Sequence, residues 1–284
     1  MPNWCSNYLE IESEQFIKDS KESLNHDKIG LMMFLILKLP DVMGHDKEKI
    51  HTIIQNFGEK AATPENMEQL ESFFHDFFPN EILDSDSAIQ AYIDQAHKNR
   101  FGKKLTPNEV RKIIQSPNII THEVMEFSLF NFTTRPMKLF LGEQFQFSLT
   151  DEEEKIIEAD VISSNNETIG TKWDASVNDI DIIDNTAFIR FNTAWSPPIP
   201  AIQNMADKYP DAKIKLVYAE QGCAYCGQLE FEGGDEVMDL QSDFSFMEPE
   251  DMSEEECDDA FDNIDNWSFD DGVEIHLLNG NHGG

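Results

Sequence analysis

The residues with the most familiar chemistry are Cys223-Ala-Tyr-Cys226, two thiols with a two-residue spacer. Such a pair can hold zinc or lower a thiol pKa for redox work. Zinc needs four ligands, however, and Cys5 and Cys257 form no second pair with this spacing. A thioredoxin-like site has the motif at a helix start, whereas this pair precedes a predicted strand at 228–231. We therefore predict a hairpin turn of small residues, with no bound metal and no cofactor.

A second motif, Gly233-Gly234-Asp235-Glu236-Val237, resembles the GGDEF signature of diguanylate cyclases. In those enzymes the acids hold Mg²⁺ and nucleotide phosphates on a hairpin within the catalytic domain. Here the motif follows the last strand predicted before the acidic region, and no phosphate-binding element precedes it. We interpret it as a coincidence within a region rich in Gly, Asp and Glu.

A third group of polar residues accompanies two tryptophans. Asp174 follows Trp173, and Asn192 and Thr193 precede Trp195, so these side chains can line a ligand pocket. Aromatic residues on strands are more often part of a core, which favours a structural role. The chain has no GxGxxG, Walker, GxSxG or HExxH motif and no complete EF-hand loop. We predict no catalytic residues and expect a protein that is not an enzyme.

Charge is the strongest feature of the sequence. Its 284 residues include 55 acidic and 21 basic residues, a formal net charge of −34. No Lys or Arg follows Lys215, and 16 acidic residues lie between Asp235 and Asp271. Binding nucleic acid or an anionic membrane requires basic residues that displace counterions. We therefore expect no direct contact with nucleic acid or membrane, and attraction to a basic protein surface.

The acidic region contains the residues that we expect to contact a partner: Asp235, Glu236, Asp239, Asp243, Glu250, Asp251, Glu254, Glu255, Glu256, Asp258, Asp259, Asp262 and Asp265. Apolar residues such as Phe244 and Trp267 interrupt the acids, which lets the region dock and become ordered. The pattern predicts a helix over 250–266 and a last strand over 273–278. The alternative is a solvated tail that only promotes solubility.

The elements before residue 165 are predicted to be mainly helical. Alternation predicts a strand over Asn7–Glu12, followed by a polar helix over 13–24. The apolar run at 29–39 is compatible with either a buried helix or a buried strand. Thr63 and Thr106 each precede proline and an acid, the start signal of a helix. Further helices are predicted over 85–99, 122–130 and 136–147.

The elements after residue 165 alternate more sharply and predict a sheet. We expect strands over 186–195, 214–219 and 228–232, a strand or the edge of one over 171–175, and a short strand or turn over 180–183. A turn is predicted at Asn178 and Asp179, and a helix between Pro198 and Tyr209. This order with short connections fits an antiparallel sheet with helices on one face.

Four stretches carry a resemblance to a known family: MPNWCSNYLEI at the N-terminus, GTKWDA from Gly170, TAWSPP from Thr193, and VYAEQG from Val217. They resemble the YubB-type ferredoxin-like family, which bacteriophages and conjugative plasmids encode and whose function is unknown. The resemblance implies an α+β fold in which the N-terminal strand joins the later strands in one ferredoxin-like antiparallel sheet. The expected organisation is a sheet domain of residues 1–40 and 166–234, a helical insertion over 41–165, and an acidic C-terminal segment over 235–284.

The functional hypothesis combines the charge with this resemblance. DNA carries about one negative charge per 1.7 Å of its axis, and a surface dense in carboxylates can approximate that field. We expect a protein of a mobile genetic element, in the host cytoplasm, that inhibits a host nucleic-acid-handling or defence protein by DNA mimicry. The alternatives are an adaptor with a solubilising acidic surface, and a nucleotide-related enzyme that uses the cleft of the sheet.

Overall fold

The computed structural model describes residues 3–24, 55–77, 106–117, 119–132, 162–246, 267–269 and 272–278, with isolated positions between 28 and 94. The chain divides into two compact units. The first contains residues 1–21, 123–132 and 169–284, and the second contains residues 22–122 and 133–168. These boundaries differ from the predicted ones, because residues 123–132 return to the first unit and the acidic C-terminal segment belongs to it.

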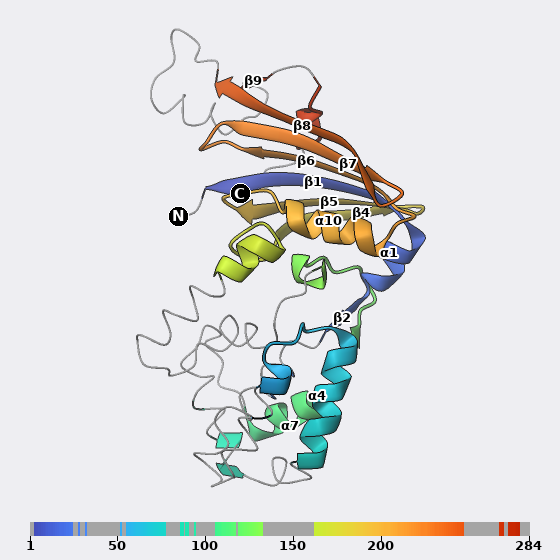
Figure 1. Cartoon of the computed structure of the whole chain (residues 1–284), viewed down its shortest axis with the longest axis vertical. Coiled ribbons are helices and arrows are strands. Elements are labelled where there is room, and N and C mark those ends of the chain that lie inside the picture. The colour runs from blue at the N-terminus through green and yellow to red at the C-terminus, as the bar shows by residue number, and fades with distance from the viewer. Residues whose placement is uncertain are drawn as a thin grey trace. The chain divides into compact units, whose positions relative to one another are not determined.

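The first unit is built on one antiparallel sheet with the strand order β4-β5-β1-β6-β7-β8-β9 (Figure 1). Its strands are β1 (Trp4–Glu12), β4 (Ser176–Ile183), β5 (Thr186–Ala194), β6 (Lys213–Glu220), β7 (Tyr225–Glu232), β8 (Asp235–Phe246) and β9 (Trp267–Phe269). The N-terminal strand β1 lies between β5 and β6, so residues nearly 200 positions apart are neighbours. The predicted antiparallel sheet that includes the N-terminal strand is confirmed.

One face of this sheet is covered by helical elements. These are α1 (Glu14–Asp19), α10 (Ile199–Lys208) and the 3₁₀ helix η1 (Leu129–Phe132), of which α1 and α10 lie on the same side of the sheet in Figure 1. Alternate strand residues such as Leu9, Ile189 and Leu216 are fully buried beneath them. Side chains alternate between the two faces of a strand, so an apolar residue at every second position creates one continuous apolar layer on this face. We call this side the helix face.

The opposite face is partly covered by the 3₁₀ helix η3 (Ile275–Leu278), where the sequence predicts a last strand over 273–278. That prediction is wrong. Val273, Ile275 and Leu278 all pack against residues of β1, β6 and β7, an arrangement that a strand's alternation does not permit. The amide of Glu274 donates to the Gln228 side chain instead of to a neighbouring strand (3.0 Å).

The acidic region begins within the sheet. β8 pairs with β7 through a two-residue turn, in which Gly233 and Gly234 both have positive φ (69° and 82°). This is the combination that a type I′ hairpin requires. The strand predicted over 228–232 ends at Glu232 as expected, but the acidic region then continues the sheet with β8, a strand that the sequence did not predict. The predicted helix over 250–266 lies outside the described residues.

Three further predictions differ from the structure: the strand over 171–175, the turn at Asn178 and the helix over 122–130. Residues 171–175 are not a strand, and the buried Thr171 hydroxyl donates to the carbonyl of Ala194 (2.9 Å). Asn178 does not form a turn but lies at an irregularity within β4. The predicted helix over 122–130 is also wrong: only the short η1 forms, because the Asp174 carboxylate accepts from the Leu129 amide (2.8 Å).

The described part of the second unit contains helices α4 (Pro64–Phe77) and α7 (Pro107–Gln115), as predicted. A capping box between Thr106 and Glu109 begins α7. Strands β2 (Glu22–Leu24) and β3 (Ile119–Thr121) form a separate small sheet, so the predicted helix over 13–24 ends early, at Asp19. The predictions for 29–39 and 136–147, and much of that for 85–99, fall outside the described residues. Among the helices that are described, none is long and apolar enough to cross a membrane.

Candidate functional site

Four of the predicted partner-binding acids lie on β8. Asp235, Glu236, Asp239 and Asp243 are all exposed. The described residues form no ion pair with any of these four carboxylates. The remaining predicted acids lie outside the described residues: Glu250, Asp251, Glu254, Glu255, Glu256, Asp258, Asp259, Asp262 and Asp265.

Strand pairing decides which face each of the four acids occupies. Glu236 lies opposite Phe231, and Asp239 opposite Leu229. Directly paired residues share a face, and both apolar partners belong to the core beneath the helices. Glu236, Asp239 and Asp243 are therefore on the helix face, at the uncovered margin of the sheet. Asp235 is on the opposite face, so the four acids do not form one row.

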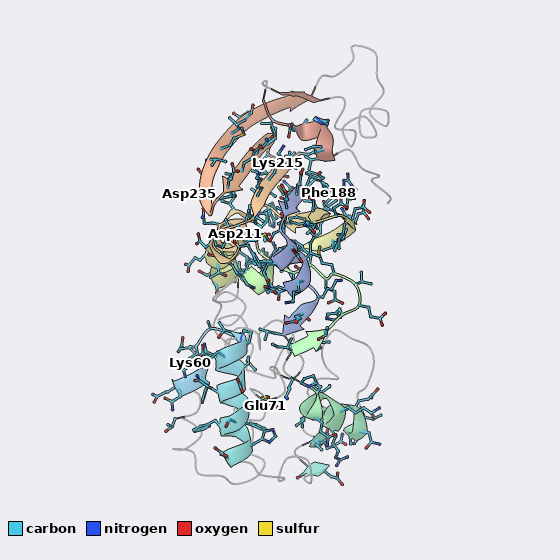
Figure 2. The ribbon with its side chains drawn as sticks, turned by 90° about the vertical axis from the view of Figure 1, so that its right-hand side faces the viewer. Lys60, Glu71, Phe188, Asp211, Lys215 and Asp235 are labelled. Atoms are coloured by element: carbon cyan, nitrogen blue, oxygen red, sulfur yellow. The ribbon has the colours of Figure 1, made fainter. Side chains whose placement is uncertain are left out.

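The negative charge is concentrated in the unit that contains the sheet. That unit has 32 acidic and seven basic residues, a net −25 of the total −34. Its basic residues are Lys18, Lys21, Lys172, Arg190, Lys208, Lys213 and Lys215. The lysines of β6 already contact carboxylates: Lys215 lies 2.6 Å from Glu274 and 3.6 Å from Glu230, and Lys213 lies 3.6 Å from Glu232. Figure 2 shows Lys215 on the sheet and Asp235 at its margin.

The two cysteines of the Cys-x-x-Cys motif do not act as a pair. Cys223 is exposed in the β6–β7 turn, while Cys226 is buried within β7, which begins earlier than predicted. Burial and the nearby Asp243 charge raise the pKa of Cys226 to about 11. A hydrogen bond to Glu220 and its charge raise the pKa of Cys223. Both thiols stay protonated near neutral pH, which disfavours redox chemistry and metal binding.

The buried Glu220 is a structural residue that no sequence motif indicates. Its two carboxylate oxygens accept from the backbone amides of Gly222 (2.9 Å) and Cys223 (2.6 Å). The carboxylate therefore organises the β6–β7 turn. Among the described residues, no group of three or more His, Cys, Asp or Glu is arranged to hold a metal ion.

The residues around the tryptophans have structural roles. Asp174 accepts hydrogen bonds from the Leu129 and Ala175 amides and from the Ser128 hydroxyl. Thr193 accepts from the Asn7 amide group and donates to the Ser196 carbonyl. The tryptophans themselves are not part of the core, contrary to our expectation.

Trp4, Trp173 and Trp195 have exposed fractions of 47%, 39% and 50%. Trp195 has a positive φ of 72°, because the chain turns sharply after β5. The three rings lie at or near the ends of strands, where the described elements leave them partly exposed. The alternation of apolar and polar residues therefore does not by itself predict whether they are buried.

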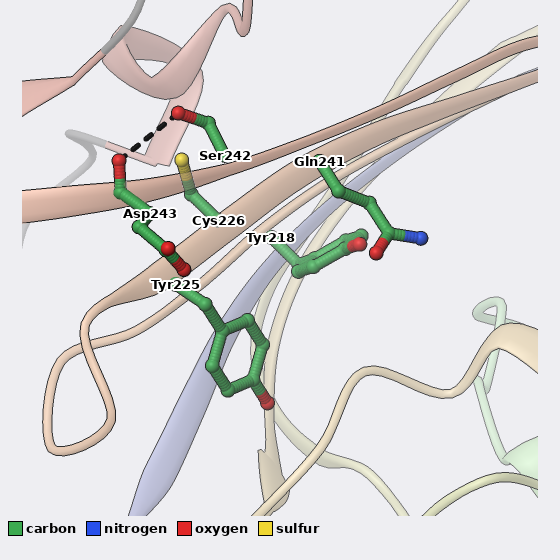
Figure 3. A pocket seen from close by; sticks show the side chains of 6 residues that line it. All are labelled: Tyr218, Tyr225, Cys226, Gln241, Ser242 and Asp243. Carbon is green, nitrogen blue, oxygen red and sulfur yellow. Dashed lines mark hydrogen bonds between the residues drawn. The ribbon is translucent and has the colours of Figure 1, made fainter.

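A polar hollow of about 220 Å³ lies at the margin of the sheet, on β6, β7 and β8 (Figure 3). Its lining residues are Tyr218, Tyr225, Cys226, Gln241, Ser242 and Asp243. Strand pairing creates it: Tyr218, Gly227 and Gln241 form one cross-strand row, and Glu220, Tyr225 and Asp243 form the next. No local pattern in the sequence indicates this hollow, because it depends on the register of β8.

The sheet with its helices on one face is the arrangement of a ferredoxin-like domain of the α+β class. Residues 172–262 match a family model described as the ferredoxin-like domain in Api92-like protein. The crystal structure of the protein api92 from Yersinia pseudotuberculosis is similar to this chain, with a TM-score of 0.60 and 11% sequence identity. The similarity covers 85% of this chain and 98% of that protein. The predicted ferredoxin-like fold is confirmed. No curated protein sequence matches the chain.

Proposed function

We propose that this chain is a non-catalytic acidic protein of a mobile genetic element. It binds a basic surface of a host nucleic-acid-handling or defence protein and blocks that surface as a DNA mimic. The observation that carries the proposal is the group of exposed β8 carboxylates, with which no described residue forms an ion pair. Their charge is available to a partner, unlike that of the acids that contact the β6 lysines.

The spacing of these carboxylates can be compared with the spacing of phosphates along DNA. A strand rises about 3.3 Å per residue, so Glu236, Asp239 and Asp243 span roughly 23 Å of the helix face. One strand of DNA carries about seven phosphates over that length. The helix face of β8 therefore carries less than half the negative charge per unit length of one DNA strand. The nine predicted acids between Glu250 and Asp265 supply the remaining charge.

The chemistry of the other polar groups supports a binding protein over an enzyme. The carboxylates of Asp174 and Glu220 are held by backbone amides, and the thiols of the Cys-x-x-Cys motif have raised pKa values. A catalytic group needs a free lone pair or a proton that it can exchange near neutral pH. These four groups serve the fold instead.

Affinity capture from host lysate tests the proposal. We expect the tagged protein to retain a basic nucleic-acid-binding protein, duplex DNA to displace it, and capture to weaken steeply as salt rises. Replacing Asp235, Glu236, Asp239 and Asp243 with Asn or Gln should reduce capture. The same change at Glu254, Glu255, Glu256, Asp258 and Asp259 should also reduce it.

A matched control carries Glu59→Gln, Glu65→Gln, Glu68→Gln and Asp76→Asn, four exposed acids of the second unit. This control should capture the partner as well as the wild type does. Capture that ignores salt, or that persists in both variants of the acidic region, contradicts DNA mimicry. The latter result would instead fit an adaptor whose acids serve solubility.

A further inference from the structure

The polar hollow on β6, β7 and β8 has the size of a site for one side-chain head group. Its volume of about 220 Å³ is below the roughly 300–1,000 Å³ of typical small-molecule pockets. A nucleotide or cofactor does not fit such a space, whereas a single charged group does. The choice of ligand therefore depends on the charge and shape of the walls.

The electrostatic field in the hollow is negative. Asp243 is exposed, and within the described part of the chain nothing donates a hydrogen bond to its carboxylate. Burial, and after it the charge of the nearby Asp239, raise the pKa of Tyr218 to about 12. The lysines of β6 extend from the opposite face of the sheet, and no Lys or Arg follows them in the chain. The hollow thus attracts a cation that none of the described residues provides there.

Two tyrosines supply aromatic walls. The ring centroids of Tyr218 and Tyr225 are 6.2 Å apart, with an angle of 65° between the rings. The Tyr225 hydroxyl donates to the Trp195 carbonyl (2.9 Å), which fixes its ring beside Asp243. The face of an aromatic ring attracts a cation, and it attracts a planar guanidinium especially well because the two can stack.

The remaining polar groups, of Tyr218 and Gln241, can each accept hydrogen bonds as well as donate them. Tyr218 is only 3% exposed as a residue, and no described residue pairs with its hydroxyl group. Gly227 makes room for this ring, because a Cβ atom there would overlap the Tyr218 hydroxyl. Gln241 occupies the same cross-strand row and brings an amide oxygen. Figure 3 shows Gln241 beside the Tyr218 ring, and the Asp243 carboxylate beside Tyr225.

We propose that this hollow binds the guanidinium group of an arginine from a partner protein. Asp243 is its counter-charge, the Tyr225 ring stacks on it, and the oxygens of Gln241 and Tyr218 accept its outer N–H groups. Guanidinium has five donors in one plane, which matches acceptors distributed around a wall better than a compact ammonium does. This inference rests on the proposed function for the nature of the partner, and it adds which basic residue anchors the contact.

An NMR titration of the full chain with N-acetyl-arginine amide tests the site. We expect saturable shifts of the Tyr218 and Tyr225 ring resonances. Asp243→Asn should weaken binding about tenfold or more, since a charge-assisted hydrogen bond is lost. Asp211→Asn, which neutralises an exposed acid in the turn before β6, should leave it unchanged. The contact between the two tyrosine rings in Asp243→Asn verifies that the variant is folded.

Two neutral or differently shaped probes complete the test. The citrulline analogue has the shape of arginine without its charge and should not bind, and the lysine analogue should bind more weakly. Equal binding of either analogue, unchanged binding by Asp243→Asn, or absence of shifts at both tyrosines overturns the proposal. Because the titration contains no partner protein, its outcome is independent of whether capture from lysate succeeds.

Discussion

At the scale of single residues, two polar side chains outside the acidic region stabilise the fold. Asp174 holds the start of η1, and Glu220 holds the turn that contains Cys223. Each satisfies backbone amides that secondary structure leaves unpaired, and a buried amide without a partner is costly. The acids that remain free for binding, such as Asp243, are those at the uncovered margin of the sheet.

The buried carboxylate of Glu220 gives a prediction at this scale. Glu220→Gln keeps the shape but replaces one acceptor oxygen with a donor that faces a backbone N–H. We expect a loss of about 1–3 kcal/mol in the free energy of unfolding, measured by urea denaturation. The exposed Glu232→Gln should cost less than about 1 kcal/mol, because it removes only a surface ion pair with Lys213. Equal losses in the two variants would contradict the role assigned to Glu220.

At the scale of elements, β8 determines where function is expected. The strand places acidic residues on both faces of the sheet, and the register shift near Glu236 displaces Val237 from the regular alternation. Without this strand neither the carboxylate group nor the polar hollow would exist. Both depend on the hairpin that joins β7 to β8.

The hairpin turn can be tested by two substitutions at Gly233, whose φ is 69°. Gly233→Asn should be tolerated, because Asn-Gly is a preferred sequence for a type I′ turn. Gly233→Val should lower the free energy of unfolding by about 1–2 kcal/mol, since a β-branched residue is strained at positive φ. A Cβ at this position has open space around it, so strain is separated from crowding. Equal urea midpoints for the two variants would exclude this turn conformation.

At the scale of the whole molecule, the formal charge of −34 has two opposite effects. Repulsion among like charges destabilises the compact state, while the same field attracts a basic partner. Salt screens both effects, with a Debye length near 10 Å at 0.1 M. Folding and binding should therefore respond to salt in opposite directions.

This opposition gives a prediction for the isolated protein. We expect the midpoint of thermal unfolding to rise by several degrees between 20 and 200 mM NaCl, as followed by circular dichroism, while capture of the partner weakens. The variant in which all four β8 acids are neutralised should show a smaller rise, because less repulsion remains to be screened. A midpoint that falls with salt would mean that attractive ion pairs dominate the fold.

Local patterns in the sequence determined much of the fold. Alternation located β1, β5, β6 and β7, the Thr-Pro signals located the starts of α4 and α7, and composition gave the net charge. These features depend on neighbours within a few residues, which the sequence displays directly.

Only the tertiary structure decided the rest. The segment 122–130 forms no α-helix before η1 because groups far along the chain hold its backbone: the Glu126 amide donates to the Ser20 carbonyl, and the Leu129 amide to the Asp174 carboxylate. Residues 273–278 form a 3₁₀ helix because three apolar side chains pack together on the sheet. The hollow of Tyr218, Gln241 and Asp243 arises from the register of three strands. Register and long-range contacts follow from packing between distant residues, and no local window of the sequence contains that information.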